Sequence, residues 1–235
     1  MALTLPKFDR AQLNMLVRGA EKIFENAESL YREAEILAKT GAMARALFLH
    51  QISLEECSKI GNISTWAISL LAGYHVNQNK VLEAFGRHSS KNKTNAYMLE
   101  RSPAEKDAEE HHDLKAALKE FKKLQEQFHY KSNSAKNASL YVDWKDGEFI
   151  APREQISLEM LNEIIVRNET FLGDANHNLR MLKGLEKAPD EMQGMVVEFI
   201  EMAEKMRAQN PEDPKGAINA LINRFLDIEL KKKKS

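Results

Sequence analysis

The stretch from Ala42 to Trp66, AMARALFLHQISLEECSKIGNISTW, predicts the first part of a long helix that carries a polar cluster in an apolar setting. Its small and apolar residues recur at intervals of three and four, which is the spacing of one helix face. Glu55 falls on or beside that face, where a carboxylate is costly to bury without a partner. Lys59 lies one turn further on, so we expect Glu55 and Lys59 to satisfy each other inside a bundle. Glu56 is also within reach of Lys59.

Amphipathic segments on both sides of this stretch predict an all-α, antiparallel helical bundle. Residues 9–39 place apolar side chains on one face, and Thr40-Gly41 then stops the helix, because glycine accepts the left-handed backbone that closes a helix end. So short a break folds the second helix back antiparallel on the first. Further helices are predicted over 81–85, 103–130, 157–185, 191–208 and 216–230, with a loop over 131–137.

A small β-hairpin is predicted near residues 140–151, as an insertion in the bundle. Two short strands, Leu140–Trp144 and Glu148–Ala151, flank the dipeptide Asp146-Gly147. This dipeptide is the strongest short hairpin signal, because both positions of the favoured turn need a positive φ. Three aromatic residues of the hairpin are expected to seal one end of the bundle: Tyr141, Trp144 and Phe149.

The composition is that of a helix-rich protein without an extreme charge. The chain has 235 residues and a formal net charge of −1, so attraction to nucleic acid or to an anionic membrane would need a local patch. We expect a bundle domain, residues 1–187, and a C-terminal helical extension with a basic tail, residues 188–235. No apolar run reaches the roughly 20 residues of a membrane span, and no secretory signal is apparent. We therefore expect no membrane association and a cytoplasmic location.

The motifs predict neither a metal site nor a cofactor. The single cysteine, Cys57, lacks the Cys/His spacing of a metal site and is interpreted as a buried, inert thiol. His111 and His112 are adjacent, and neighbouring side chains on a helix point about 100° apart, so the pair cannot chelate one metal from the helix alone. Glycine-rich phosphate-binding spacings are absent from the sequence.

Three stretches of the chain carry a resemblance to a known family. The first is Leu-Glu-Glu at residues 54–56 with Lys59 following, after a small-residue helix that begins at a glycine. The second is FGRHSSK, residues 85–91, and the third is SLYVD, residues 139–143. Together they resemble the AbiV-type abortive infection proteins, a branch of the HEPN helical superfamily. A HEPN-like bundle is the fold that this resemblance implies.

The same resemblance implies an intracellular phage-defence effector that acts on RNA or translation. In that interpretation Glu55, Glu56, Lys59, His88 and Lys91 line one polar pocket. The histidine would serve as acid or base, the lysines would hold a phosphate, and the glutamates would orient both. We therefore predict that the His88 ring lies within hydrogen-bond reach of Glu55 or Glu56. RNA and a phage or host regulatory protein are the expected partners, and we expect a homodimer.

Whether the chain is catalytic is left open by the sequence. HEPN ribonucleases carry an Arg, a polar residue and, a few residues later, a His, usually in the last core helix. Arg167-Asn168 begins such a motif, but the next histidine, His177, lies too far along. Arg45 and His50 have the spacing, although in the second helix and with apolar residues after the arginine, which favours a chance match. The alternative function is a non-enzymatic helical protein-interaction module whose polar cluster is structural.

Overall fold

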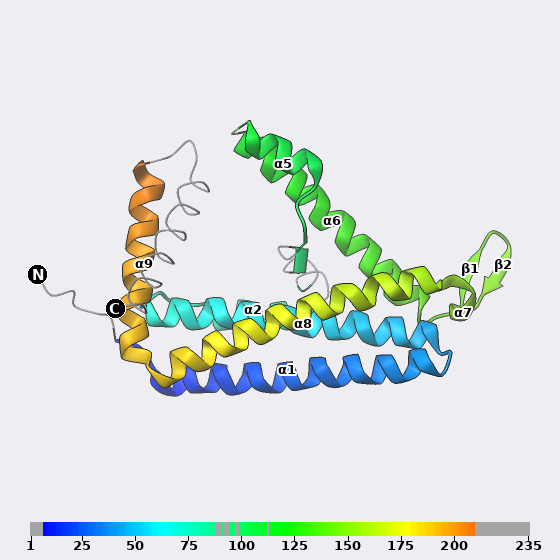
Figure 1. Ribbon diagram of the computed structural model, residues 1–235, viewed down its shortest axis with the longest axis horizontal. Helices are drawn as coiled ribbons and strands as arrows, with labels where there is room; N and C mark the ends of the chain where they lie inside the picture. The colour runs from blue at the N-terminus through cyan, green and yellow to red at the C-terminus, as the bar shows by residue number, and fades with distance from the viewer. Residues whose placement is uncertain (1–6, 88–90, 92–94, 97–98, 112, 210–235) are drawn as a thin grey trace, which may run out of the picture.

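The core of the protein is a layer of three long helices. The computed structural model describes residues 7–209, apart from 88–90, 92–94, 97–98 and 112. The three helices are α1 (Arg10–Lys39), α2 (Met43–Leu71) and α8 (Leu158–Lys187). They run side by side along the long axis of the molecule (Figure 1), and most of the buried apolar side chains come from them. The all-α helical bundle predicted from the sequence is confirmed.

The pairing of α1 with α2 follows from local signals at both ends of α1. At its start, Oδ1 of Asp9 accepts hydrogen bonds from the backbone N–H groups of Ala11 and Gln12, at 2.8 and 3.1 Å. At its end, Gly41 has a φ of +81°, a left-handed conformation that suits glycine. The chain therefore turns back at once. Small buried residues at every seventh position of α1 let the two helices approach closely: Ala20, Ala27 and Ala34.

The second helix, α2, is packed on all sides rather than along one stripe. Every residue from Ser53 to Ser58 is buried, including the two glutamates. A helix buried around its circumference needs neighbours in every direction, and α2 contacts α1, α8, α6 (Leu114–Ala138), α7 (Pro152–Gln155) and α9 (Pro189–Gln209). Both adjacent carboxylates of this stretch are therefore buried, although their side chains point to different sides of the helix.

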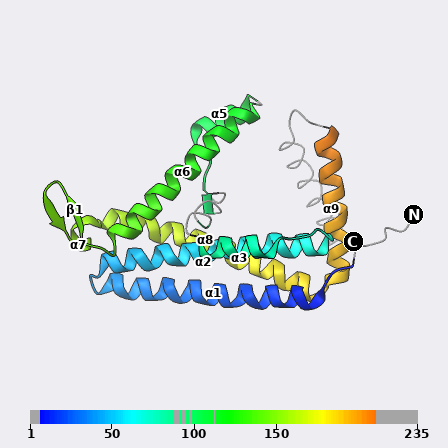
Figure 2. The same ribbon diagram turned by 180° about the vertical axis from the view of Figure 1, so that it is seen from behind.

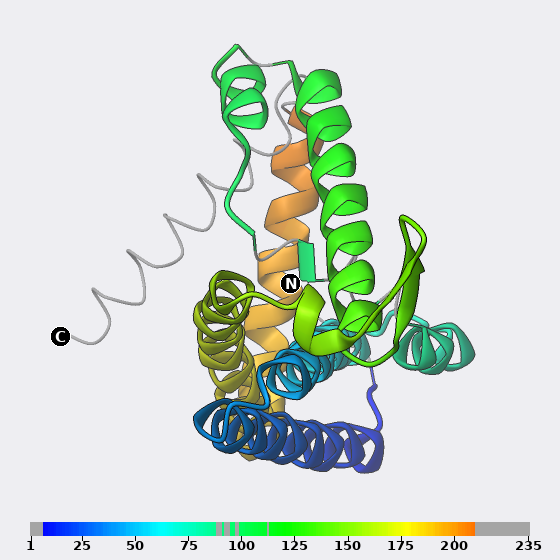
Figure 3. The same ribbon diagram turned by 90° about the vertical axis from the view of Figure 1, so that its right-hand side faces the viewer.

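Two arms rise from the same side of this core layer. One arm is a hairpin of α5 (Pro103–Glu110) and α6 (Leu114–Ala138). The other arm is α9 (Pro189–Gln209), which crosses the core at the end where α1 begins and α8 ends (Figure 1). Figure 2, the view from behind, and Figure 3, the view along the core, show the same arrangement. A short helix, α3 (Gln78–Gly86), follows α2.

The helix predicted over residues 103–130 begins at Pro103 as expected, but its continuity and its end are wrong. It is interrupted after Glu110, and α6 starts afresh with Asp113 as its cap, whose Oδ1 accepts from the N–H of Ala116 at 2.9 Å. The loop predicted over 131–137 is also wrong, because α6 continues to Ala138. Ser132 and Lys136 are buried there. Packing of this polar segment against α2 overrides the loop preference of its composition.

The β-hairpin is confirmed, but its expected packing is wrong. The strands β1 (Asp143–Lys145) and β2 (Glu148–Ile150) are joined by Asp146 and Gly147, whose φ values of 54° and 90° are both positive. The aromatic residues do not seal the bundle: Tyr141, Trp144 and Phe149 are 63%, 59% and 76% exposed. The hairpin projects beyond α7 (Pro152–Gln155) at the end of the core (Figure 1), so Trp144 and Phe149 pack edge to face on each other instead.

The C-terminal part of the chain is described as far as Gln209. The predicted helix over 191–208 is confirmed as α9, and the side-chain amide of Gln193 donates to the carbonyl oxygen of Leu71 in α2 at 2.8 Å. The predicted helix over 216–230 and the basic tail lie outside the described residues, and the domain boundary after residue 187 stays a prediction. None of the helices in the described part combines the length and apolar composition of a membrane span.

Candidate functional site

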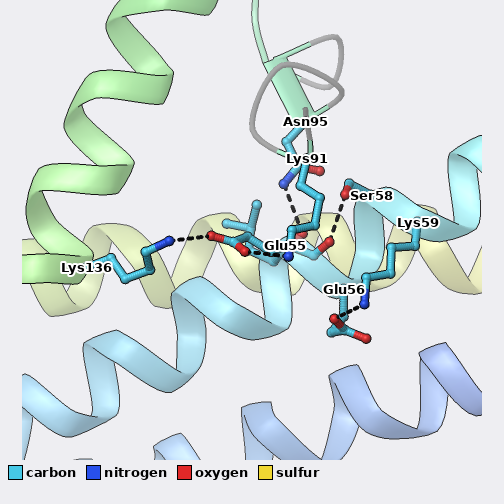
Figure 4. A network of polar contacts seen from close by, with 8 residues as sticks. Glu55, Glu56, Ser58, Lys59, Lys91, Asn95 and Lys136 are labelled. Carbon is cyan, nitrogen blue, oxygen red and sulfur yellow. Dashed lines mark hydrogen bonds and ion pairs between the residues drawn. The ribbon is translucent and has the colours of Figure 1, made fainter. Parts of the chain in front are cut away.

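The centre of the candidate site is the carboxylate of Glu55, which is 0% exposed. Its two oxygens face two lysines from different parts of the chain (Figure 4). Nζ of Lys91 lies 2.9 Å from Oε2, and Nζ of Lys136 lies 3.1 Å from Oε1. Both lysines are buried as well. This ion-pair cluster, Glu55 with Lys91 and Lys136, joins α2 to the segment between α3 and α5 and to the end of α6.

Two neutral side chains support this cluster from its flank. The amide nitrogen of Asn95 donates to the carbonyl oxygen of Leu54 at 2.9 Å, and the hydroxyl of Ser58 donates to the carbonyl oxygen of Glu55 at 2.7 Å. Asn95 is almost fully buried, so this hydrogen bond is shielded from water. The segment that carries Lys91 is thus held to α2 at two points, four residues apart.

Glu56 and Lys59 form a separate ion pair on the side of α2 that faces α1 (Figure 4). The predicted partnership of Glu55 with Lys59 is therefore corrected: Lys59 pairs with Glu56, three residues before it, and Glu55 takes Lys91 and Lys136. The reason is that other segments pack against α2 and bring their own lysines to Glu55. In an isolated helix, only the lysine of the same helix would be within reach.

The structure brings together only part of the pocket that the sequence predicted. Glu55 and Lys91 meet as expected, whereas the Glu56–Lys59 pair points elsewhere. His88 lies outside the described residues, so its contact with the glutamates stays a prediction. Lys136 is absent from the predicted pocket, because the composition of its segment predicts a loop. A signal for it existed: Phe128, Ser132 and Lys136 continue the buried face of α6 at intervals of four.

A second polar cluster surrounds the buried ring of His50. Nε2 of His50 lies 3.5 Å from a carboxylate oxygen of Glu35, and its Nδ1 accepts from the side-chain amide of Asn168 at 3.2 Å. The ring also packs edge to face on Tyr31. Burial lowers the pKa of His50, and the nearby carboxylates of Glu35 and Glu169 oppose that shift. This cluster ties α1, α2 and α8 together.

The pair with ribonuclease-like spacing, Arg45 and His50, is split between two environments. Arg45 is exposed, whereas His50 is enclosed in the core with its partners in α1 and α8. The asparagine of the incomplete motif, Asn168, contacts His50 and also accepts from the hydroxyl of Ser53 at 3.2 Å. The amide therefore takes part in core hydrogen bonds.

Cavities lie on both sides of the ion-pair cluster. One of about 440 Å³, between α2, α6 and α8, includes Gln51 and Ser132, each one turn before a member of the cluster. Another of about 310 Å³ is lined in part by Ser58, Asn95 and Cys57. Burial raises the pKa of the Cys57 thiol to about 12, with the carboxylate of Glu56 adding to the shift. Among the described residues, no group of three or more His, Cys, Asp and Glu side chains could hold a metal ion.

The helical bundle agrees with a HEPN-type protein, whose family is helical. A family model described as AbiV matches residues 15–173, which is more than half of the chain, and the chain belongs to this family. It is also 53% identical over 110 residues to the uncharacterized protein y4gJ of Sinorhizobium fredii. That similarity covers 47% of this chain and 57% of the relative, so it spans little more than half of the relative's length. No solved structure gave a significant match.

Proposed function

We propose that this chain is an intracellular abortive-infection effector that acts by binding a phage or host regulatory protein. Membership of the AbiV family supports the defence role. The mode of action rests on one observation: Glu55 has no exposed surface, and both of its oxygens face buried lysines. A general acid or base must reach the proton that it transfers. A carboxylate enclosed in this way is better suited to holding three segments of the fold in place.

The surface that we propose for the partner is the β-hairpin at the end of the core. It follows α6 directly, and Lys136 fixes the last turn of α6 to Glu55. Three aromatic side chains are more than half exposed here: Trp144 and Phe149 in the strands, and Tyr141 just before them. Exposed aromatic groups of this kind are enriched at protein interfaces. The expected homodimer remains part of this proposal, and light scattering of the purified chain measures it.

A second candidate is an enzyme that acts on RNA. The observation that favours it is an excess of positive charge, because two ammonium groups share one carboxylate beside a cavity that Arg167 also lines. A phosphate group would balance that charge. This candidate predicts that His88→Ala and Glu56→Ala each abolish growth arrest of infected cells without unfolding the protein.

Phage challenge of cells that express the chain separates the two candidates. The binding proposal predicts that Trp144→Ser combined with Phe149→Ser abolishes protection, while His88→Ala and Glu56→Ala retain it. Ile36→Ser is the matched control, because Ile36 is equally exposed on α1, away from the hairpin. Loss of protection in the His88 and Glu56 variants, with the hairpin variant still protective, would replace the binding proposal by the enzymatic one.

A further inference from the structure

A third buried glutamate lies in the arm formed by α5 and α6, away from Glu55 and Glu56. Glu105 is 5% exposed and sits in the first turn of α5. Its backbone N–H donates to Oγ of Ser102, the cap of that helix, at 3.1 Å. Its Oε2 atom, however, has no hydrogen-bond partner in the described part of the chain. A buried carboxylate oxygen without a donor is energetically unfavourable, so this site is incomplete as it stands.

Glu105 lines a cavity of about 370 Å³ between α5 and α6. This volume is in the range of roughly 300–1,000 Å³ that is typical of small-molecule sites. Much of the remaining wall is apolar: Leu99, Leu114, Leu118, Phe121 and Leu124. The cavity therefore offers one buried acid among hydrophobic side chains, which is a small number of polar groups placed to orient a ligand.

The nearest cation of the wall does not neutralise Glu105. Nη1 of Arg101 lies 2.7 Å from Oε2 of Glu109, and both residues line the same cavity. The lining thus holds two carboxylates and one guanidinium group, and its net charge is negative. A Ser-x-x-Glu sequence can also let the glutamate cap its own helix by accepting from the N–H of Ser102. Here Oε2 remains unpartnered, so the charge stays available to the cavity.

We propose that this cavity binds an organic cation, an ammonium or guanidinium group on an apolar body. The cation pairs with Glu105, and the apolar body packs against the leucines. A metal ion suits the site less well, because hard cations such as Ca²⁺ take about six to eight oxygen ligands, whereas this carboxylate faces hydrocarbon. The site is independent of the proposed defence function, and it lies outside the cluster on α2.

Titration of the purified full chain with n-hexylammonium, followed by isothermal titration calorimetry, tests the proposal. We expect saturable binding of one amine per chain. The matched uncharged ligand is 1-hexanol, which has the same apolar body and should bind at least about tenfold more weakly, because it cannot pair with a buried carboxylate. Equal binding of the two ligands, or no binding of the amine, would overturn the proposal.

Variants locate the binding to the cavity. Glu105→Gln removes the charge and keeps the shape, and it should weaken amine binding at least about tenfold. Glu110→Gln is the matched control, because Glu110 is exposed on the same helix and does not line the cavity. Ala117→Leu places extra volume in the cavity wall and should weaken both ligands. An unchanged affinity in Glu105→Gln, or an equal loss in Glu110→Gln, would contradict the assignment.

A third ligand distinguishes a free amine from a protein side chain. N-acetyl-lysine N-methylamide carries the same ammonium group on a blocked amino acid. Tighter binding of this compound than of n-hexylammonium identifies a lysine side chain as the natural occupant. Tighter binding of n-hexylammonium identifies a small free amine. Each result supports the cation site only if it is lost in Glu105→Gln.

Discussion

Glu55 and Glu105 are both buried glutamates, yet only Glu55 has charged partners on both of its oxygens. Glu55 lies in the three-helix core, where the chain after α3 and the end of α6 each contribute a lysine. Glu105 lies in a two-helix arm, and its Oε2 has no hydrogen-bond partner among the described residues. The difference shows that burial alone does not define the role of a carboxylate. Its hydrogen-bond and ion-pair partners decide whether it stabilises the fold or is available to bind a ligand.

The largest effect is expected from Glu55→Gln. This change removes the negative charge that two buried ammonium groups share, and breaking a buried ion pair from one side typically costs about 3–5 kcal/mol of unfolding free energy. Urea denaturation measures it. Glu28→Gln serves as the control, because Glu28 pairs with Arg32 on the surface and such pairs contribute about 1 kcal/mol or less. A loss in Glu55→Gln no larger than in the control would refute the buried cluster.

A smaller effect is expected in the coupling between Glu55 and Lys136. Lys136→Met should destabilise the wild type and be neutral or stabilising when Glu55 is already Leu, because the lysine then has no carboxylate to pair with. Residues in direct contact typically show coupling energies of about 0.5–3 kcal/mol. A double-mutant cycle measured by urea denaturation gives this quantity. If the two single changes in unfolding free energy simply add up in the double variant, the Glu55–Lys136 pair contributes nothing to stability.

Acid should destabilise the core through His50. Burial lowers its pKa below the ordinary 6.5, so the folded chain keeps the neutral ring. As the pH falls below 6.5, the unfolded chain binds a proton that the folded chain does not, and stability decreases until the lowered pKa is reached. Unfolding free energies between pH 7 and pH 5 should therefore fall less steeply in His50→Asn than in the wild type. Identical slopes would show that the ring is not held neutral.

The smallest effect, with the opposite sign, is expected from Glu105→Gln. Replacing a buried, incompletely partnered carboxylate by a neutral amide should raise the unfolding free energy by about 1 kcal/mol or less. The same denaturation series that shows a loss for Glu55→Gln should show this gain. If both glutamines destabilise the protein alike, Glu105 has a structural partner, and the contrast between the two sites disappears.

Local features of the fold could be predicted because the signals lie close together in the chain. Asp9 and Gly41 mark the ends of α1, and Asp146-Gly147 selects the hairpin turn. The apolar spacing of α2 placed Glu55 in the core. The position of the hairpin could not be predicted in this way. Its aromatic residues have the composition of a core, but none of the elements that the structure describes covers that end of the bundle.

Lys91 followed from the family resemblance, but Lys136 could not be predicted, because both lysines reach Glu55 through packing between distant segments. Spacing along one helix offered Lys59, whereas the actual cations lie 36 and 81 residues further on. Lys136 stands in KSNSAKN, a polar stretch that is typical of a loop, and only its contact with α2 makes it part of a buried helix. An ion pair such as Glu55–Lys136 needs the tertiary structure before it can be named.

Phage protection by a variant without any charge in the ion-pair cluster tests most directly whether this cluster is structural. Glu55→Leu, Lys91→Met and Lys136→Met together replace the buried ion pairs by apolar groups of similar size, which is often neutral for stability. Circular dichroism and urea denaturation verify that the variant is folded. If the cluster is structural, the folded variant protects cells as well as the wild type does. A folded variant that has lost all protection would show that these charges act on a substrate or ligand.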